Sequence, residues 1–130
     1  MDSICHLKIC TVNIGGFSPN SIMCLDKYND ENKFDIIKVQ ETGKRDDVDL
    51  CNMKYIKDDN KAKNRGTMIY VKNDHSITKL KSLNQLSEQI DTTWGLAIIQ
   101  GKRYIVASVY LKHKYIQGLK DLNNILKQAY

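Results

Sequence analysis

Two short apolar runs with a helix-forming segment between them constrain the fold of this chain more than any other feature. Residues 7–14 are rich in β-branched and apolar side chains and end at a pair of glycines, which predicts a strand that enters a loop. Residues 34–39 form a second short apolar run, typical of a buried strand. If these two strands are parallel neighbours, their carboxyl ends meet at one edge of a sheet.

The segment between the two runs has the signals of a helix. Ser18 or Asn20 can cap its first turn, and the polar residues 29–33 are expected to end it. Its expected apolar face consists of Ile22, Met23, Leu25 and Tyr28.

The rest of the chain predicts further strands followed by a helix. Residues 55–56 indicate a weak strand and residues 67–71 a stronger one, and residues 94–99 and 104–110 have the spacing of a hairpin. Apolar residues at offsets of three, four and seven predict an amphipathic helix over residues 115–130. This order predicts an α/β or α+β sandwich layer.

Length and composition favour one compact unit. The chain has 130 residues, 42% of them hydrophobic, and contains a single proline. No stretch approaches the roughly 20 apolar residues of a membrane span, and no secretory signal is visible at the start. The four cysteines lack zinc-site spacing, so we expect reduced thiols in a cytoplasmic or nuclear protein that is not secreted and does not bind membranes.

The basic excess is confined to one end of the chain. Residues 1–100 hold equal numbers of basic and acidic side chains, so the net charge of +5 arises within residues 101–130. A local positive region attracts polyphosphate backbones or other acidic surfaces. The alternative is that lysines such as Lys120 and Lys127 only solvate a helix.

Asn13 and Glu41 follow the two predicted strands. Asn13 lies at the end of the first strand and Glu41 just past the second, so parallel pairing would place both at the same sheet edge. A carboxylate and an amide suit a hard cation such as Mg²⁺, which takes one or two protein carboxylates and completes its shell with water and phosphate oxygens. The alternative is a turn residue and a solvated charge.

Four segments resemble the endonuclease/exonuclease/phosphatase superfamily. TVNIGG at 11–16 is similar to its asparagine motif, and DIIKVQET at 35–42 resembles its Gln-Glu motif. RGTMIYVKN at 65–73 is similar to the next strand of the family. The run from Trp94 to SVYLKHK at 108–114 resembles the hairpin that ends in a tyrosine beside the phosphate site. Short connections and the basic tail look closest to endonuclease domains of non-LTR retrotransposons.

The resemblance implies roles for individual residues. Glu41 would bind the divalent metal, Mg²⁺ or Mn²⁺, and Asn13 would belong to the metal site or orient the phosphate. Tyr110 would place a hydroxyl near the scissile phosphate, although Lys112 stands where many members have a proline. A buried strand aromatic is the alternative for Tyr110. DNA or another nucleic acid would be the partner, contacted by the basic residues Arg65, Lys102, Arg103, Lys112 and Lys114.

The resemblance also implies that residues 1–130 are an incomplete domain, the N-terminal half of a four-layer α/β/β/α sandwich of the deoxyribonuclease I-like type. The family's GDFN-like strand and its later Asp and His are not found in this sequence. We therefore expect the second sheet to be missing, which would leave Ile36, Val39, Ile98 and Val106 short of packing partners. Another chain could supply the missing half.

Other conspicuous residues receive structural assignments. His75 and His113 lack the partners of a catalytic triad and are expected at the surface. Arg65 can contact a phosphate as a bidentate donor, but its position favours a solvated loop residue. Trp94 is expected to anchor the core, because single-strand binders present several exposed aromatics.

Three functions remain open from the sequence. The first is a divalent-metal-dependent phosphodiester hydrolase, a DNA endonuclease of retrotransposon origin that is truncated and inactive alone. The second is a non-catalytic remnant that binds nucleic acid or a protein partner. The third is a member that acts on inositol phosphates or phospholipids.

Overall fold

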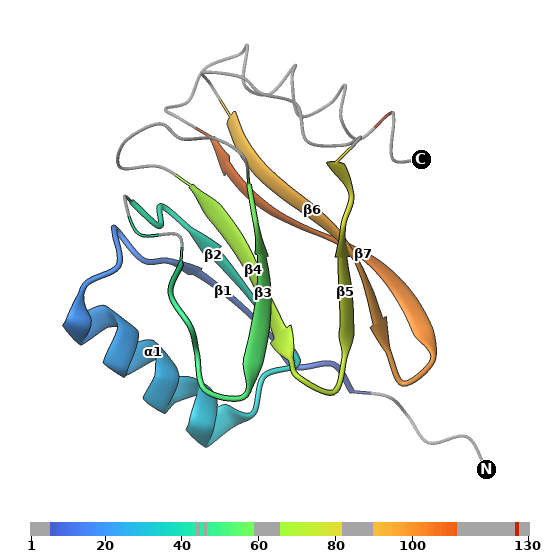
Figure 1. Ribbon diagram of the computed structural model, residues 1–130, viewed down its shortest axis with the longest axis horizontal. Helices are drawn as coiled ribbons and strands as arrows, with labels where there is room; N and C mark the ends of the chain where they lie inside the picture. Colours follow the sequence, from blue (N-terminus) through green and yellow to red (C-terminus); the bar gives the residue numbers. More distant parts are fainter. Residues whose placement is uncertain are drawn as a thin grey trace.

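The computed structural model describes residues 6–43, 45, 47–58, 66–81, 90–111 and 127, and these residues form one helix and two sheets. The elements in chain order are β1 (Ile9–Asn13), α1 (Pro19–Asn32), β2 (Ile36–Gln40), β3 (Met53–Lys57), β4 (Thr67–Lys72), β5 (Ser76–Lys79), β6 (Ile90–Ile99) and β7 (Lys102–Leu111). Sheet A has the order β1-β2-β4-β3, and sheet B has the order β5-β6-β7 (Figure 1). The predicted α+β class is confirmed.

Sheet A presents one face to α1. Strands β1 and β2 are parallel, as the strand–helix–strand pattern predicts, whereas β4 pairs antiparallel with β2 and β3. Alternate side chains of the sheet, including Ile37, Val39, Met68 and Tyr70, form a core with Phe17 and Leu25 beneath the helix.

Helix α1 has well-defined ends. The Ser18 side chain accepts from the Ser21 backbone N–H, Pro19 occupies the first turn, and Lys33 ends the helix in a left-handed conformation. The apolar face is narrower than expected. Leu25 is buried, but Met23 and Tyr28 are 64% and 51% exposed. The polar segment continues the helix to Asn32, because the buried Asn29 amide oxygen accepts from the Phe34 N–H and closes the helix end.

Sheet B packs on the other face of sheet A, so the expectation that the second sheet is missing is wrong. Ile36, Ile69 and Val71 of sheet A form a core with Ala97 and Ile99 of sheet B, and Val106 packs against it. Ile36 and Val39 are fully buried, while Ile98 is exposed because it points to the outer face of sheet B. Gly95 of β6 allows sheet B to pack closely on sheet A, since a side chain at this position would collide with Ile56 of sheet A and with Ile77 of sheet B. Strand content alone does not say which strands share a sheet.

The predicted hairpin is longer than its apolar runs. β6 and β7 pair over ten residues each, joined by Gln100 and Gly101, both with positive φ as a two-residue hairpin turn requires. Trp94 is buried and packs against Leu80 and Ala107, which confirms its assignment to the core.

Strand β1 extends past sheet B. Strands β5, β6 and β7 contact β2, β3 and β4. On the face of β1 that points toward sheet B, Ile9, Thr11 and Asn13 are all exposed, and Ile9 retains 48% of its surface. Within the described residues, the side of sheet B next to β7 is therefore one strand short of covering sheet A.

The predicted helix over residues 115–130 lies outside the described residues apart from Lys127, as does the predicted fourth layer. No helix in the described part of the chain is both long and apolar enough to cross a membrane.

Candidate functional site

Parallel pairing brings Asn13 and Glu41 to the same edge of sheet A. Asn13 is the register partner of Gln40, the residue before Glu41. Beyond the strands, the Ile14 N–H donates to the Gln40 carbonyl at 3.0 Å and the Gly16 N–H to the Glu41 carbonyl at 2.6 Å. The two loops that carry the candidate residues are thus hydrogen-bonded to each other.

Asn13 is exposed and organises its own loop. Its amide oxygen accepts from the Gly15 N–H at 3.1 Å, and both Gly15 and Gly16 have positive φ. This Asx turn is the structural role that the sequence left open for Asn13. The amide oxygen has two lone pairs, so one remains available for a further ligand.

Glu41 leaves β2 in a left-handed conformation, with φ of 54° and a half-exposed side chain. Such a conformation is uncommon for a residue other than glycine and is frequently associated with functional sites. The next residue, Thr42, is buried and its N–H donates to the Gly66 carbonyl. Its hydroxyl has no hydrogen-bond partner among the described residues.

Tyr110 lies at the same end of the molecule. Tyr104 and Val106 of β7 pack on the core near Ile36, while Ser108 contacts Gln40, so β7 runs in the same direction as β2. Tyr110 shares a face with Ser108, is half-buried, and has Asp91 as its register partner on β6. Figure 1 shows β7 ending near the loops that follow β1 and β2.

Polar residues beneath this edge were missed by the sequence analysis. Gln40 donates through Nε2 to the Ser108 hydroxyl at 3.0 Å, and Ser108 donates to the Val39 carbonyl at 2.9 Å. Thr93 donates to the Thr67 carbonyl, and Thr67 donates to Asp58. All of these side chains, and that of Asp91, are buried. In the sequence these residues are visible only as polar positions within predicted strands. The analysis of apolar patterns did not consider such positions.

The two predicted basic contacts that the structure describes lie away from this edge. Lys102 and Arg103 are exposed at the start of β7, by the hairpin turn. The seven residues from Arg103 to Tyr110 separate these side chains from the Tyr110 end by about 23 Å at 3.3 Å per residue. Arg65, Lys112 and Lys114 lie outside the described residues.

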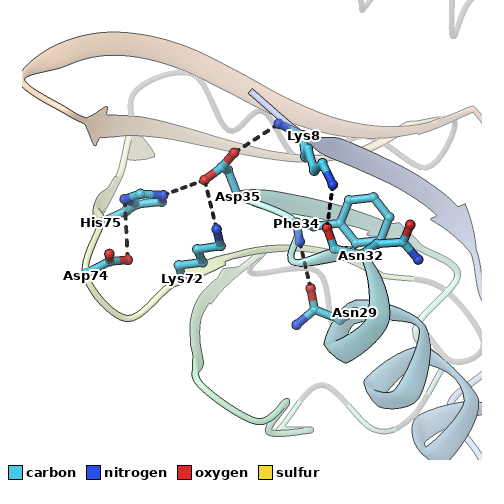
Figure 2. Close-up of polar contacts among 8 residues, drawn as sticks. All are labelled: Lys8, Asn29, Asn32, Phe34, Asp35, Lys72, Asp74 and His75. Atoms are coloured by element: carbon cyan, nitrogen blue, oxygen red, sulfur yellow. Dashed lines mark hydrogen bonds and ion pairs between the residues drawn. The ribbon is translucent and has the colours of Figure 1, made fainter. Parts of the chain in front are cut away.

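At the opposite edge of sheet A, Asp35 is the centre of a polar cluster (Figure 2). Its carboxylate accepts from the Lys8 N–H at 2.9 Å, lies 3.4 Å from Lys72 Nζ, and is 2.9 Å from His75 Nε2. Burial raises the pKa of Asp35, but these hydrogen bonds and the charge of Lys72 together hold it below its usual range. His75 is only 8% exposed, so the expectation of a surface histidine is wrong. A carboxylate 40 residues away in the sequence makes its burial possible.

The described residues contain no group of three or more His, Cys, Asp or Glu side chains close enough together to hold a metal ion. The two candidate residues at the Asn13 edge offer a carboxylate and an amide oxygen, both hard donors. Two protein oxygens fit a hydrated Mg²⁺ or Mn²⁺, which needs few protein ligands, better than they fit a structural zinc site.

Comparison with known proteins shows the fold. No protein-family model matches the sequence, and no curated protein matches it significantly. Among solved structures, the endonuclease domain of TRAS1, a telomere-specific non-LTR retrotransposon, has a TM-score of 0.73 at 12% identity over 95% of this chain and 55% of its own. An endonuclease/exonuclease/phosphatase family protein from Bacteroides thetaiotaomicron has a TM-score of 0.67 at 14% identity, covering 95% and 57%. TDP2 from D. rerio, solved with a single-strand DNA product, has a TM-score of 0.66 at 13% identity, covering 95% and 54%.

The chain spans about half the length of these structures. The likeness extends over 95% of this chain. The chain thus has the deoxyribonuclease I-like fold of endonuclease/exonuclease/phosphatase proteins, over about half the length of the matched chains.

Proposed function

We propose that this chain carries the metal-binding part of a divalent-metal-dependent phosphodiester hydrolase that acts on DNA, of the retrotransposon endonuclease type. The observation that carries the proposal is the parallel register of Asn13 with Gln40, which brings Asn13 and Glu41 to one edge. The hydrogen bond from Gln40 to Ser108 brings the Tyr110 end of β7 close to the same edge. The fold is shared with a retrotransposon endonuclease domain, and another protein of the same fold has been solved with single-strand DNA.

In this proposal each residue has a distinct task. The Glu41 carboxylate holds Mg²⁺ or Mn²⁺, and the Asn13 amide orients a phosphate oxygen or a metal-bound water. Tyr110 donates a hydrogen bond to the phosphate from the neighbouring strand end. The cation, when bound, neutralises charge on the phosphate and polarises it toward attack.

The described residues do not supply the whole of this chemistry. Phosphodiester hydrolysis also needs a group that orients and deprotonates water, and general acid–base catalysis contributes typically 10²- to 10⁴-fold. We propose that this group comes from residues that complete the domain, whether in the same polypeptide or in a partner chain. The 130-residue chain alone is therefore expected not to cleave DNA detectably.

Nucleic-acid binding by the chain is proposed to be electrostatic and independent of sequence. Lys102 and Arg103 contribute phosphate contacts at the hairpin end, and Lys112, Lys114 and Arg65 are proposed as further contacts. Affinity for DNA should fall steeply between low and moderate salt, as counterion release requires. Affinity that hardly changes with salt would argue against phosphate contacts.

The metal site is tested by calorimetric titration with Mn²⁺. The parent chain should bind Mn²⁺, and the Glu41→Gln variant should bind at least about tenfold more weakly because it loses the charge of the proposed ligand. Glu31→Gln, a change on the exposed side of α1, should bind as the parent does. Equal affinity for the parent and Glu41→Gln would contradict the proposed site.

Plasmid nicking tests the incomplete-site part of the proposal. Neither the parent nor Glu41→Gln should nick supercoiled DNA with Mg²⁺ or Mn²⁺. Metal-dependent nicking by the parent that is lost in Glu41→Gln would show that the residues of this chain, or a dimer of it, already form a complete site.

A further inference from the structure

The two strands that carry Glu41 and Tyr110 are joined by a buried pair of polar side chains. Gln40 precedes Glu41 and is 9% exposed, and Ser108 lies two residues before Tyr110 and is 1% exposed. Gln40 Nε2 donates to Ser108 Oγ at 3.0 Å, and Ser108 Oγ donates to the Val39 carbonyl at 2.9 Å. The Ser108 hydroxyl thus contacts the last two residues of β2, accepting a hydrogen bond from one and donating a hydrogen bond to the other.

Stability alone does not explain this pair. Two buried polar groups that hydrogen-bond only to each other and to the backbone can be replaced by apolar side chains of similar shape at little cost. A hydrogen bond is directional, whereas apolar contacts between two sheets allow small sliding movements. The pair therefore gives β2 and β7 a defined position relative to each other at the end where the candidate residues lie.

The direction of the Glu41 side chain depends on the position of the end of β2 more than that of a residue inside the strand would. Its left-handed backbone takes it out of the regular alternation of β2, so the pleat of the sheet does not set its direction. Gln40 is the last residue with strand geometry. Catalytic and metal sites tolerate displacements of only about 0.5 Å, so the position of Gln40 determines the geometry available to Glu41.

We propose that Ser108 and Gln40 are positioning residues that set the separation between a metal ion at Glu41 and the Tyr110 side chain. This inference rests on the proposed function. A second polar contact between the sheets provides a matched control. Thr93 donates to the Thr67 carbonyl at 2.9 Å and is fully buried. Thr67 pairs with Gln40 in sheet A, but the hydrogen bonds of Thr93 lead to β4 and on to Asp58, and not to β2, so the control lies close to the site without joining β7 to β2.

Terbium luminescence measures this separation. Tb³⁺ takes the same hard oxygen ligands as Mg²⁺ and Mn²⁺, and its emission rises when an excited tyrosine lies nearby. The part of the emission that is lost in Tyr110→Phe reports the distance from the bound ion to Tyr110. The probe is Tb³⁺ alone, titrated into the full 130-residue chain, with Tb³⁺ affinity and emission per bound ion as the two readouts.

In Ser108→Ala, the Tb³⁺ affinity should fall about tenfold, in the range seen when partners that orient a metal ligand are removed, and the Tyr110-dependent emission should fall with it. Gln40→Met keeps the side-chain length, removes the donor and should do the same, so the test does not depend on one variant folding. The double variant should lose little more than either single one, because the two residues act as a pair. Thr93→Val should leave both readouts as in the parent.

The outcomes separate the two proposals. If Tb³⁺ binds and Glu41→Gln does not weaken it, the proposed metal site is wrong and the positioning role is wrong with it. If Glu41→Gln abolishes binding but Ser108→Ala and Gln40→Met leave affinity and Tyr110-dependent emission unchanged, only the positioning role is overturned. Equal losses in Thr93→Val would likewise overturn it, because they would show a general effect of loosening the sheets.

Discussion

Glu41, the residue proposed to bind the metal ion, has a left-handed backbone that is expected to lower the stability of the fold. A non-glycine residue with φ of 54° carries conformational strain, which neighbouring interactions must offset. The loop is held by the hydrogen bonds of Gly16 to the Glu41 carbonyl and of Thr42 to the Gly66 carbonyl. A glutamate in a strained turn is expected where its carboxylate has a role, because the backbone conformation itself does not favour glutamate.

The Glu41→Gly variant should therefore be more stable than the parent by about 1 kcal/mol, because glycine adopts positive φ without strain. It should also lose Mn²⁺ binding. Urea unfolding measures the first effect and titration the second. Glu31→Gly is the control, since glycine in the last turn of α1 should lower stability by up to about 1 kcal/mol. Loss of stability in Glu41→Gly would show that the carboxylate makes structural contacts.

The Asp35 carboxylate makes the stability of the fold depend on pH. Its pKa in the folded chain is lower than in the unfolded chain, so the stability it contributes is fully present above the unfolded pKa of about 3.9 and is lost as pH falls through the lower folded pKa. One hydrogen bond to a charged group contributes about 2 kcal/mol to the free energy of unfolding.

The free energy of unfolding of Asp35→Asn should consequently be about 2 kcal/mol lower than that of the parent at pH 7. This difference should shrink as the solution is acidified below pH 4. Urea midpoints at several pH values measure this. Asp74→Asn, at a mostly exposed carboxylate 3.6 Å from His75 Nδ1, is the control and should have a small effect at every pH. A constant difference between parent and Asp35→Asn from pH 7 to pH 3 would contradict the assignment.

Among individual elements, strand β7 is an edge strand of sheet B within the described residues. Among the described strands it pairs only with β6, and residues 104–111 contain no charge, proline or glycine that would discourage pairing with another chain. Ile105 on this strand is 46% exposed, and the nearby β1 leaves Ile9 uncovered. Self-association is expected through this side of the molecule, where sheet B falls one strand short of sheet A, and not through a missing second sheet.

Ile105→Lys should reduce self-association of the chain by introducing a charge on this edge strand, with a change in stability within about 0.5 kcal/mol because the residue is partly exposed. Sedimentation velocity at several concentrations measures the effect. Thr78→Lys, an exposed change on β5 at the other edge of sheet B, should leave self-association as it is in the parent. An equal decrease in both variants would point to net charge and not to the β7 edge.

The elements that the sequence predicted well are those whose apolar residues follow a local pattern. Strands β1, β2 and β4 and the β6–β7 hairpin are of this kind. The four-residue strand β5 was missed, and β6 begins four residues earlier than predicted because Asp91, Thr92 and Thr93 are buried polar residues. Their burial depends on partners in distant strands, such as Thr67 for Thr93, and a local pattern contains no information about such partners.

At the scale of the whole molecule, the sequence predicted the fold class and the shared edge of Asn13 and Glu41 because both follow from two parallel strands. It did not predict that Lys102 and Arg103 lie at the other end of β7, or that Gln40 and Ser108 join the sheets. Both depend on the direction in which sheet B crosses sheet A. That direction is set by packing among Ile36, Ile69, Ala97 and Ile99, which are far apart in the sequence.

The most direct test of the proposed site is to locate a bound Mn²⁺ by paramagnetic broadening in the ¹⁵N spectrum of the chain. We predict that substoichiometric Mn²⁺ broadens the amides of residues 13–16 and 40–43 and of Tyr110, and that Glu41→Gln removes this broadening. The Asp35 cluster, six residues away along β2 and thus about 20 Å distant, should stay sharp. Broadening centred instead on the 270 Å³ pocket that Asp26, Asp30 and Asp74 line at the other end of the sheet would show that the metal site is not at Glu41.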